Sequence, residues 1–263
     1  MMLEIRDLHV RFRNAEEGKE AVKGISLTME DGEILGLVGE SGSGKTVTAM
    51  ALTGLLSNAK TELSGEVIYR GMDMMKASRE TLRSFRGRDT AVVFQEPMTS
   101  MDPVMRIGPQ IEEALVVHTD LTPEERKARA LQAMADAELP DPETVYRKYP
   151  HELSGGMLQR AMIAAAIISE PKLLICDEPT TALDVTIQEG ILNLLKKINR
   201  EKGVGILFIS HNLNVVRKLC TRVAVMCRGE IVEQGPVDQV FYHPQQEYTK
   251  RLIAAIPTRK KRR

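Results

Sequence analysis

The stretch LVGESGSGKTVTAM, residues 37–50, constrains the fold of this 263-residue chain more than any other feature. An apolar run leads into three glycines within six positions, and a lysine, a threonine and a plausible helix follow. The pattern Gly-x-x-x-x-Gly-Lys-Thr, from Gly39 to Thr46, is typical of a loop that joins a strand to a helix and binds phosphate. A plain turn needs one or two glycines, but not three in register with Lys-Thr. The stretch therefore predicts a strand–loop–helix unit of an α/β fold.

The chemistry of this loop suits the phosphates of a nucleotide. Glycine lets the backbone curve closely, so that successive N–H groups point into one concavity. The helix N-terminus adds a partial charge of about +0.5. Lys45 supplies a full positive charge to the β- and γ-phosphates, and the Thr46 hydroxyl can ligate Mg²⁺. The loop is therefore the first half of a predicted nucleotide site.

A nucleotide site needs a second group on the metal side, and LLICDEP, residues 173–179, offers two carboxylates where a buried strand ends. Asp177, at the carboxyl end of this strand, is predicted to hold Mg²⁺ directly or through water. Glu178 is predicted to lie near the γ-phosphate and to polarise the attacking water, and a positioned general base contributes roughly 10²–10⁴-fold. On its own, Asp-Glu-Pro more often just begins a loop. Together with the glycine loop, it favours a catalytic site.

Short apolar runs alternate with helical patterns along most of the chain. The runs are near-continuous, as expected for parallel strands covered on both faces. They lie at residues 33–38, 90–94, 173–177, 206–210 and 222–227. Between the runs at 173–177 and 206–210, apolar residues over 187–198 recur on one helical face. The alternation indicates an α/β core with right-handed crossovers.

Two other regions differ from this core. Residues 3–12 and 64–70 alternate apolar and polar side chains, which predicts half-exposed antiparallel strands in a small sheet. From residue 97 to residue 168 the strand pattern disappears, and Thr122 and Glu125 have the spacing of a helix capping box. We therefore predict a helical insertion over residues 97–168.

Composition argues against several classes of protein. Lys and Arg number 36, as do Asp and Glu, so the net charge is zero and gives no support for bulk nucleic-acid binding. Charges near the N-terminus leave no room for the apolar core of a signal peptide. The longest charge-free stretch, Thr46–Ala59, is far shorter than the roughly 20 apolar residues of a membrane helix. Three scattered cysteines, Cys176, Cys220 and Cys227, suit a reducing compartment and give no disulfide framework or metal site.

The octapeptide LSGGMLQR, residues 153–160, is called the signature segment below. Together with the glycine loop, LLICDEP, ALD at 182–184 and His211, it resembles the ATPase subunits of ABC transporters, over about residues 3–240. The resemblance implies an α/β P-loop NTPase fold, with a RecA-like parallel sheet core, an antiparallel β subdomain and an inserted α-helical subdomain. The implied parts of one domain over 1–263 are a nucleotide-binding core with the β subdomain at 1–96 and 169–240, a helical subdomain at 97–168, and a short basic C-terminal tail at 241–263.

The resemblance implies ATP and Mg²⁺ as cofactors, with ATP held between the phosphate loop of one subunit and the signature segment of another. The implied ATP-binding residues of the loop are Gly39, Glu40, Ser41, Gly42, Ser43, Gly44, Lys45, Thr46 and Val47. The implied signature residues that bind the other subunit's ATP are Leu153, Ser154, Gly155, Gly156 and Gln159. The serine and glycines open a helix, and a helix N-terminus is suited to bind a γ-phosphate.

Several single residues take roles from the same resemblance. His211 resembles the switch histidine that contacts the γ-phosphate, Gln95 resembles the glutamine that touches Mg²⁺ or water, and Asp184 resembles the aspartate that communicates across the dimer. Phe12 is the candidate for stacking on adenine, with Val22 as a wall; Phe12 could equally pack in the core. The implied catalytic residues are Glu178, His211, Lys45 and Gln95, and the implied metal ligands are Thr46, Gln95 and Asp177.

The finer resemblance is to the peptide/nickel importer subfamily. It rests on YPHELSGG, on QEPMTSMDP (95–103) and on DEPTTALDVTIQ (177–188), while LSGGMLQRAMIA favours the nickel branch. The implied function is to power a binding-protein-dependent importer of nickel, metal chelates or di- and oligopeptides. The implied partners are a second ATPase subunit, commonly a different homologous chain, two transmembrane permease subunits and an extracytoplasmic substrate-binding protein, at the cytoplasmic face of the membrane. The alternative is an ATP-gated regulatory module with no membrane partner.

The C-terminal part departs from this pattern. Peptide-importer ATPases usually continue past HPQQEYTKRLIAAIP (243–257) into a cysteine-bearing tail, whereas this sequence stops at Arg263. The difference favours the shorter nickel-type subunit, and a truncated chain would look the same. The basic run RKKRR (259–263) is expected to be a solvated end, with contact to anionic lipid as the alternative.

Overall fold

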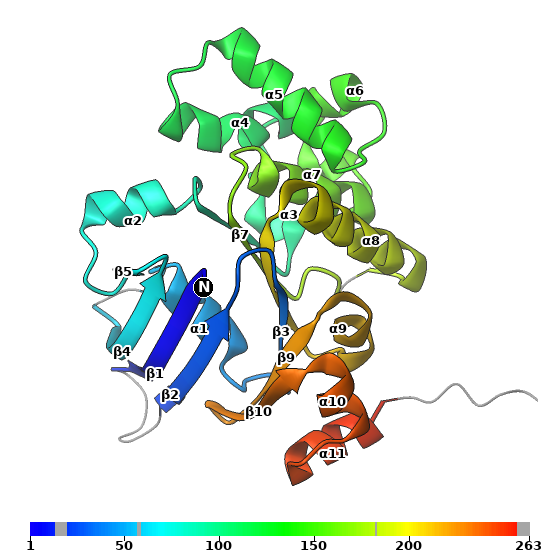
Figure 1. The fold of residues 1–263 in the computed structure, drawn as a ribbon. Coiled ribbons are helices and arrows are strands. Elements are labelled where there is room, and N and C mark those ends of the chain that lie inside the picture. Colours follow the sequence, from blue (N-terminus) through cyan, green and yellow to red (C-terminus); the bar gives the residue numbers. More distant parts are fainter. Residues whose placement is uncertain (14–19, 57–58, 182, 257–263) are drawn as a thin grey trace, which may run out of the picture. The chain divides into compact units, whose positions relative to one another are not determined.

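A computed structural model describes residues 1–13, 20–56, 59–181 and 183–256. The chain forms two compact units (Figure 1). The first unit comprises Met1–Glu30, Ile34–Met75 and the chain from Phe208 onward, and the second comprises Asp31–Glu33 and Lys76–Leu207. Ala182 of the ALD motif and the basic run at 259–263 lie outside the described residues.

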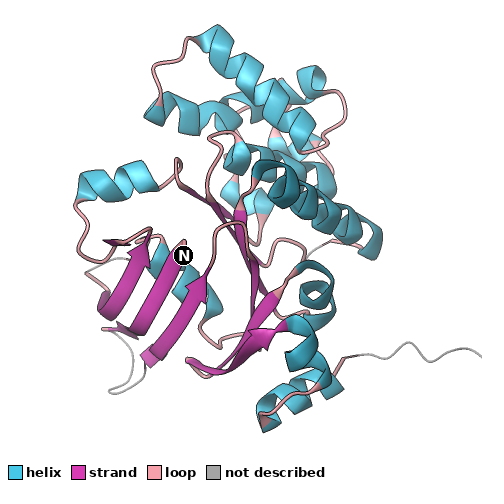
Figure 2. Ribbon diagram, in the orientation of Figure 1, coloured by secondary structure: helices cyan, strands magenta, loops and turns pink. Residues whose placement is uncertain are grey.

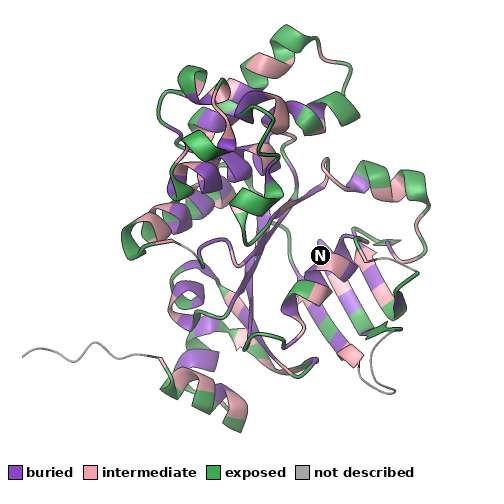
Figure 3. Ribbon diagram, turned by 180° about the vertical axis from the view of Figure 1, so that it is seen from behind, coloured by how far each residue is buried: buried purple, intermediate pink, exposed green. Residues whose placement is uncertain are grey.

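A four-stranded antiparallel sheet forms part of the first unit. Its strands, in spatial order, are β2 Glu20–Met29, β1 Leu3–Phe12, β4 Thr61–Tyr69 and β5 Met72–Asp73. Buried and exposed residues alternate along these strands (Figure 3), as the sequence predicts for a sheet with one covered face. An irregularity between Ile5 and Leu8 keeps both side chains buried. Asp7 has a left-handed conformation there (φ 47°), and Gly65 fits against it, because a Cβ on Gly65 would lie 2.2 Å from the Asp7 carbonyl oxygen.

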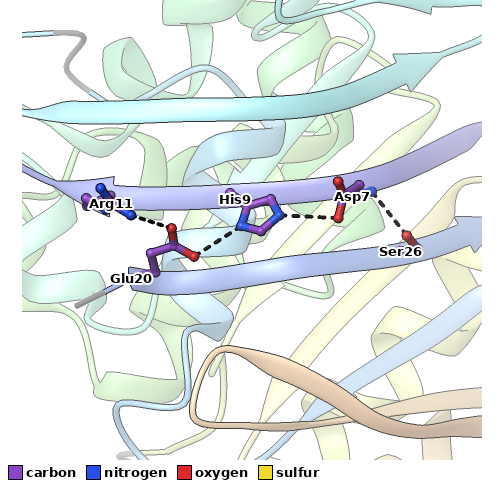
Figure 4. A network of polar contacts seen from close by, with 5 residues as sticks. All are labelled: Asp7, His9, Arg11, Glu20 and Ser26. Atoms are coloured by element: carbon purple, nitrogen blue, oxygen red, sulfur yellow. Dashed lines mark hydrogen bonds and ion pairs between the residues drawn. The ribbon is translucent and has the colours of Figure 1, made fainter. Parts of the chain in front are cut away.

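A polar network links β1 and β2 (Figure 4). His9 lies between two carboxylates: its Nδ1 is 3.1 Å from Glu20 Oε2, and its Nε2 is 3.2 Å from Asp7 Oδ1. Arg11 donates to the other Glu20 oxygen at 2.8 Å, and the Asp7 backbone N–H donates to Ser26 Oγ at 3.1 Å. The hydrogen bond between His9 and Glu20 raises the pKa of the imidazole and lowers the pKa of the carboxyl, because each charge stabilises the other.

Parallel strands of the first unit lead into the glycine loop. β3, Ile34–Val38, pairs in parallel with β9, Arg222–Cys227, and β9 pairs antiparallel with β10, Glu230–Pro236. All five residues of β3 are buried, as expected for a strand covered on both faces. The helices of this unit are α1 Lys45–Leu52, α9 Leu213–Leu219, α10 Val237–Tyr242 and α11 Glu247–Ala254. The segment 241–263, predicted as a short basic tail, thus contains a helix that was not predicted.

The second unit is largely helical (Figure 2). Its strands β6 Thr90–Val93 and β7 Leu173–Asp177 pair in parallel. Its helices are α2 Arg79–Phe85, α3 Pro97–Ser100, α4 Ile107–His118, α5 Pro123–Asp136, α6 Pro142–Tyr146, the 3₁₀ helix η1 Pro150–Glu152, α7 Gly155–Ile167 and α8 Val185–Lys202. No strand occurs from residue 97 to residue 168, a range that is described throughout. Strand β8, Gly205–Ser210, passes from this unit into the first.

Local sequence signals account for the helix starts of the second unit. The predicted capping box is present at α5: the Glu125 N–H donates to the Thr122 hydroxyl at 3.3 Å, and the Thr122 N–H donates to the Glu125 carboxylate at 2.8 Å. The pKa of Glu125 is lowered by the Thr122 N–H and hydroxyl, which stabilise its charge.

Among the described residues, no helix combines the length and the apolar character that crossing a membrane requires.

A buried polar contact joins three helices of the second unit. The Tyr146 hydroxyl in α6 donates to Glu112 Oε1 in α4, and Arg126 Nε in α5 lies 3.6 Å from Glu112 Oε2. Burial and this hydrogen bond raise the pKa of Tyr146 to about 12, so the phenol keeps its proton at neutral pH. Gly108 makes room for the ring, because a Cβ there would lie 2.3 Å from it.

Candidate nucleotide site

Two of the three loop glycines are needed because other backbone segments pack closely against them. A Cβ on Gly39 would lie 2.1 Å from the Met226 carbonyl oxygen in β9, and a Cβ on Gly44 would lie 2.5 Å from the Ala21 carbonyl oxygen in β2. Gly44 also has a φ of 107°, which favours glycine. At Gly42 (φ 78°), by contrast, a Cβ would meet no described atom within 4 Å beyond its chain neighbours. The loop is therefore tightly packed at its two ends and open in its middle.

Lys45 folds back over the loop at the start of α1. It is 4% exposed, and its ammonium donates to the carbonyl oxygens of Gly39 at 2.9 Å and Glu40 at 2.8 Å. Gly44 is the N-cap of α1, and the first turn of the helix contains no acidic residue. The partial positive charge of the helix N-terminus and the charge of the lysine therefore lie together where the loop meets the helix.

The turn between β9 and β10 supports the loop. The Gly229 N–H donates to the Ser43 carbonyl oxygen at 2.9 Å, and the Ser43 N–H donates to the Glu40 carbonyl oxygen at 3.2 Å. Met226 and Gly229 shape this site, yet the sequence motif contains no signal for either. Only their positions could have indicated them, Met226 on β9, which pairs with β3, and Gly229 in the turn that follows β9.

In the second unit, the predicted residues Gln95 and Glu178 come together. β6 and β7 are parallel neighbours, with Val93 opposite Cys176, so the residues that follow the two strands emerge at the same edge. Gln95 Nε2 donates to Glu178 Oε2 at 3.4 Å, and the Thr181 hydroxyl donates to the same oxygen at 2.9 Å. The two donors orient the carboxylate, and the motif did not predict the contribution of Thr181.

The backbone at the end of β7 is unusual. Asp177 is buried, and Glu178 directly after it has a φ of 48°, in the left-handed region that a glutamate rarely adopts. The preceding Cys176 is fully buried, and burial raises the pKa of its thiol, so this cysteine is a core residue and not a nucleophile.

The signature segment opens helix α7, as predicted. Ser154 is the N-cap and accepts a hydrogen bond from the Met157 N–H at 3.4 Å. Ser154 and Gly155 are exposed, whereas Gly156 is buried against α8, where a Cβ would lie 2.8 Å from Ile187 Cγ2. Gln159 is 1% exposed, so its side chain points into the second unit.

The remaining predicted residues divide between the units. His211 follows β8 in the first unit and is exposed, and Phe12, 36% exposed, ends β1 in the same unit. Val22 is 0% exposed, so its side chain lies within the core in this structure. Asp184, in the second unit, caps α8 by accepting the Ile187 N–H at 2.9 Å.

The donor groups fit ATP and Mg²⁺. An open loop centre, a helix N-terminus and a buried lysine are suited to bind phosphate oxygens. The predicted metal ligands are a hydroxyl, an amide and a carboxylate, on Thr46, Gln95 and Asp177. Thr46 belongs to the first unit and Gln95 and Asp177 to the second, and all three side chains carry oxygen donors of the kind that Mg²⁺ prefers.

A buried strand that runs into such a loop, together with a strand that ends in Asp-Glu, defines a P-loop nucleoside triphosphatase. The sequence profile of the ABC transporter family matches residues 22–181, and the chain belongs to this family. It is an ATPase of the ATP-binding cassette class, which uses ATP and Mg²⁺.

Individual relatives agree with this assignment. The chain is 43% identical over 258 residues to the oligopeptide transport ATP-binding protein OppD of Bacillus subtilis, a match that covers 98% of this chain and 72% of OppD. It is 47% identical over 257 residues to the peptidoglycan transport ATP-binding protein YejF of Agrobacterium fabrum, covering 97% of this chain and 47% of YejF. The solved structure of the cassette MJ0796, a post-hydrolysis dimer bound to ADP and Pi, matches with a TM-score of 0.79 at 28% identity, covering 90% of this chain and 99% of MJ0796. The predicted fold class, family and ATPase class are thereby confirmed.

Proposed function

We propose that this chain is the ATP-hydrolysing subunit of a binding-protein-dependent importer for peptides or peptide-like molecules. The observation that carries the proposal is identity of 43% and 47%, over nearly the whole chain, to relatives named for oligopeptide and peptidoglycan transport. Nickel or a metal chelate is the second candidate cargo, favoured by the stretch LSGGMLQRAMIA.

In this proposal the chain acts as one cassette and works at the cytoplasmic face of the membrane. Its core (1–96 and 169–240) binds nucleotide, and its helical region (97–168) faces two permease subunits, which a substrate-binding protein supplies with cargo. A second ATPase chain, commonly a different homologue, completes the pair. The MJ0796 cassette, solved as a dimer with ADP and Pi, supports a paired arrangement.

The residues of the site divide the chemistry among them. Lys45 and His211 neutralise charge on the γ-phosphate, and Glu178 accepts a proton from the attacking water. Gln95 and Thr181 hold the Glu178 carboxylate in one orientation, as their contacts to Oε2 indicate. Thr46, Asp177 and Gln95 would hold Mg²⁺, which neutralises phosphate charge when bound. The exposed N-terminus of α7 at Ser154 covers the nucleotide of the opposing subunit.

The role of Glu178 can be tested by Glu178→Gln. The amide keeps the size of the side chain but cannot accept the proton, so turnover should fall by about 10²–10⁴-fold while ATP binding remains. Steady-state ATPase assays and an ATP titration measure the two quantities, with Glu201→Gln on the exposed side of α8 as the matched control. Full turnover in Glu178→Gln would remove this residue from its proposed role.

The phosphate loop can be tested by Lys45→Ala, with Lys60→Ala at an exposed position as the control. Loss of a charged hydrogen-bonding partner should weaken ATP binding by roughly 1.5–3 kcal/mol, or about 10–150-fold. Unchanged affinity in a titration would contradict the assignment of this loop.

The cargo can be tested in the complete transporter. The chain, its two permeases and its binding protein are reconstituted in vesicles, and ATP-dependent uptake of labelled dipeptide, oligopeptide and nickel chelate is compared. Uptake of peptide alone supports the first cargo, uptake of nickel chelate supports the second, and failure to copurify with any polytopic protein favours a regulatory module without a membrane partner.

A further inference from the structure

A helix close to the C-terminus touches the phosphate loop. Tyr248 lies in α11, which packs against β10 in the first unit (Figure 1). Its hydroxyl oxygen accepts a hydrogen bond from the Glu40 backbone N–H at 3.2 Å, across 208 positions of sequence. Tyr248 is half-buried, and burial raises the pKa of its phenol, so the hydroxyl stays neutral near pH 7.

Tyr248 and Lys45 hold the same peptide group. The carbonyl of Gly39 and the N–H of Glu40 belong to one peptide plane, and in a trans peptide they point in opposite directions. Lys45 Nζ donates to the Gly39 carbonyl at 2.9 Å, while the Glu40 N–H donates to Tyr248. The plane is therefore fixed from both sides, and its rotation would break a hydrogen bond on each.

The start of α11 is itself anchored. The Glu233 carboxylate of β10 accepts the backbone N–H of Gln245 at 2.8 Å and that of Gln246 at 3.1 Å. Burial opposes the charge of this carboxylate, but the hydrogen bonds outweigh burial and lower the pKa of Glu233. Glu233 is therefore charged at neutral pH and fixes the segment from which Tyr248 extends.

We propose that Tyr248 is a positioning residue of the phosphate loop, which keeps the Gly39–Glu40 peptide oriented when Lys45 leaves it to bind phosphate. This inference rests on the proposed function, because it assumes that the loop binds ATP. While Lys45 contacts a phosphate, Tyr248 continues to hold the Glu40 N–H. The loop then keeps its curvature while Lys45 exchanges the Gly39 carbonyl for a phosphate, so the loop loses less conformational freedom when ATP binds.

The test compares Tyr248→Phe with the wild type and with Tyr242→Phe, which removes a hydroxyl from an exposed tyrosine of α10. Hydrogen exchange of the Glu40 amide, followed by NMR without nucleotide, should quicken about 2- to 10-fold in Tyr248→Phe alone, because the hydrogen bond from this amide to the Tyr248 hydroxyl is lost. A general loss of structure would quicken exchange throughout the first unit instead.

The second readout is nucleotide binding. In Tyr248→Phe, KM for ATP and the dissociation constant of a non-hydrolysable ATP analogue should both rise about 2- to 10-fold, with kcat within about twofold of the wild type. Unchanged exchange at Glu40, or faster exchange with unchanged KM, overturns the inference. A wild-type chain that binds no ATP overturns the proposed function instead, and the exchange measurement still decides whether Tyr248 holds the loop.

Discussion

The packing around the phosphate loop predicts that its glycines differ sharply in how well they tolerate a methyl group. Gly42 and Gly44 both have positive φ values, 78° and 107°. A residue with a Cβ pays about 1–2 kcal/mol in the left-handed region, so both alanine variants should lose at least this much stability. They differ in their surroundings, because only Gly44 has another backbone segment against it.

The extra cost at Gly44 follows from one contact. A Cβ there would lie 2.5 Å from the Ala21 carbonyl oxygen, an atom fixed within β2. Relief requires movement of the loop or the strand, and forced overpacking typically costs about 1–3 kcal/mol. Gly44→Ala should therefore lose about 2–5 kcal/mol, against about 1–2 kcal/mol for Gly42→Ala.

Urea denaturation of the nucleotide-free protein measures both free energies of unfolding. Without nucleotide, loss of ATP contacts cannot contribute to the difference between the two variants. Equal losses in the two variants, or a larger loss in Gly42→Ala, would refute the claim that Ala21 restricts the loop at Gly44.

Two further predictions concern the polar clusters away from the loop. Tyr146→Phe leaves the buried Glu112 without its hydroxyl donor and should lower the free energy of unfolding, measured by urea denaturation, by about 1–3 kcal/mol. The control Tyr149→Phe should change this free energy by no more than about 0.5 kcal/mol. Equal losses in the two variants would contradict the stabilising role of the Tyr146–Glu112 hydrogen bond. His9 has a raised pKa, chiefly through Glu20, so its contribution to stability is complete below its ordinary pKa of about 6.5 and is lost as pH rises through the raised value. The stability difference between wild type and His9→Gln, measured by urea denaturation, should therefore shrink as pH rises above about 6.5; a stability difference that grows with pH would refute this role of His9.

Features that depend on neighbours in the chain were predictable from the sequence. The five buried residues of β3, the helix that begins at Lys45, and the capping box of Thr122 and Glu125 all lie where the sequence predicts them. Their signals are local, because apolar runs, glycine spacing and cap residues act over a few positions. The sequence predicted Glu178 from the end of its strand and Gln95 from resemblance, but it did not predict their contact, which the parallel pairing of β6 with β7 explains.

What the sequence by itself determined is thus the phosphate loop, the strand and helix order and the class of protein. Only the tertiary structure decided that Gly44 packs against the Ala21 carbonyl oxygen and that Val22 is buried. It also decided that Tyr248, in a helix that was not predicted, accepts a hydrogen bond from the Glu40 N–H. These contacts join residues far apart in the chain, and no local pattern encodes them. They arise because strand pairing and helix packing bring distant backbone groups within hydrogen-bonding or van der Waals distance.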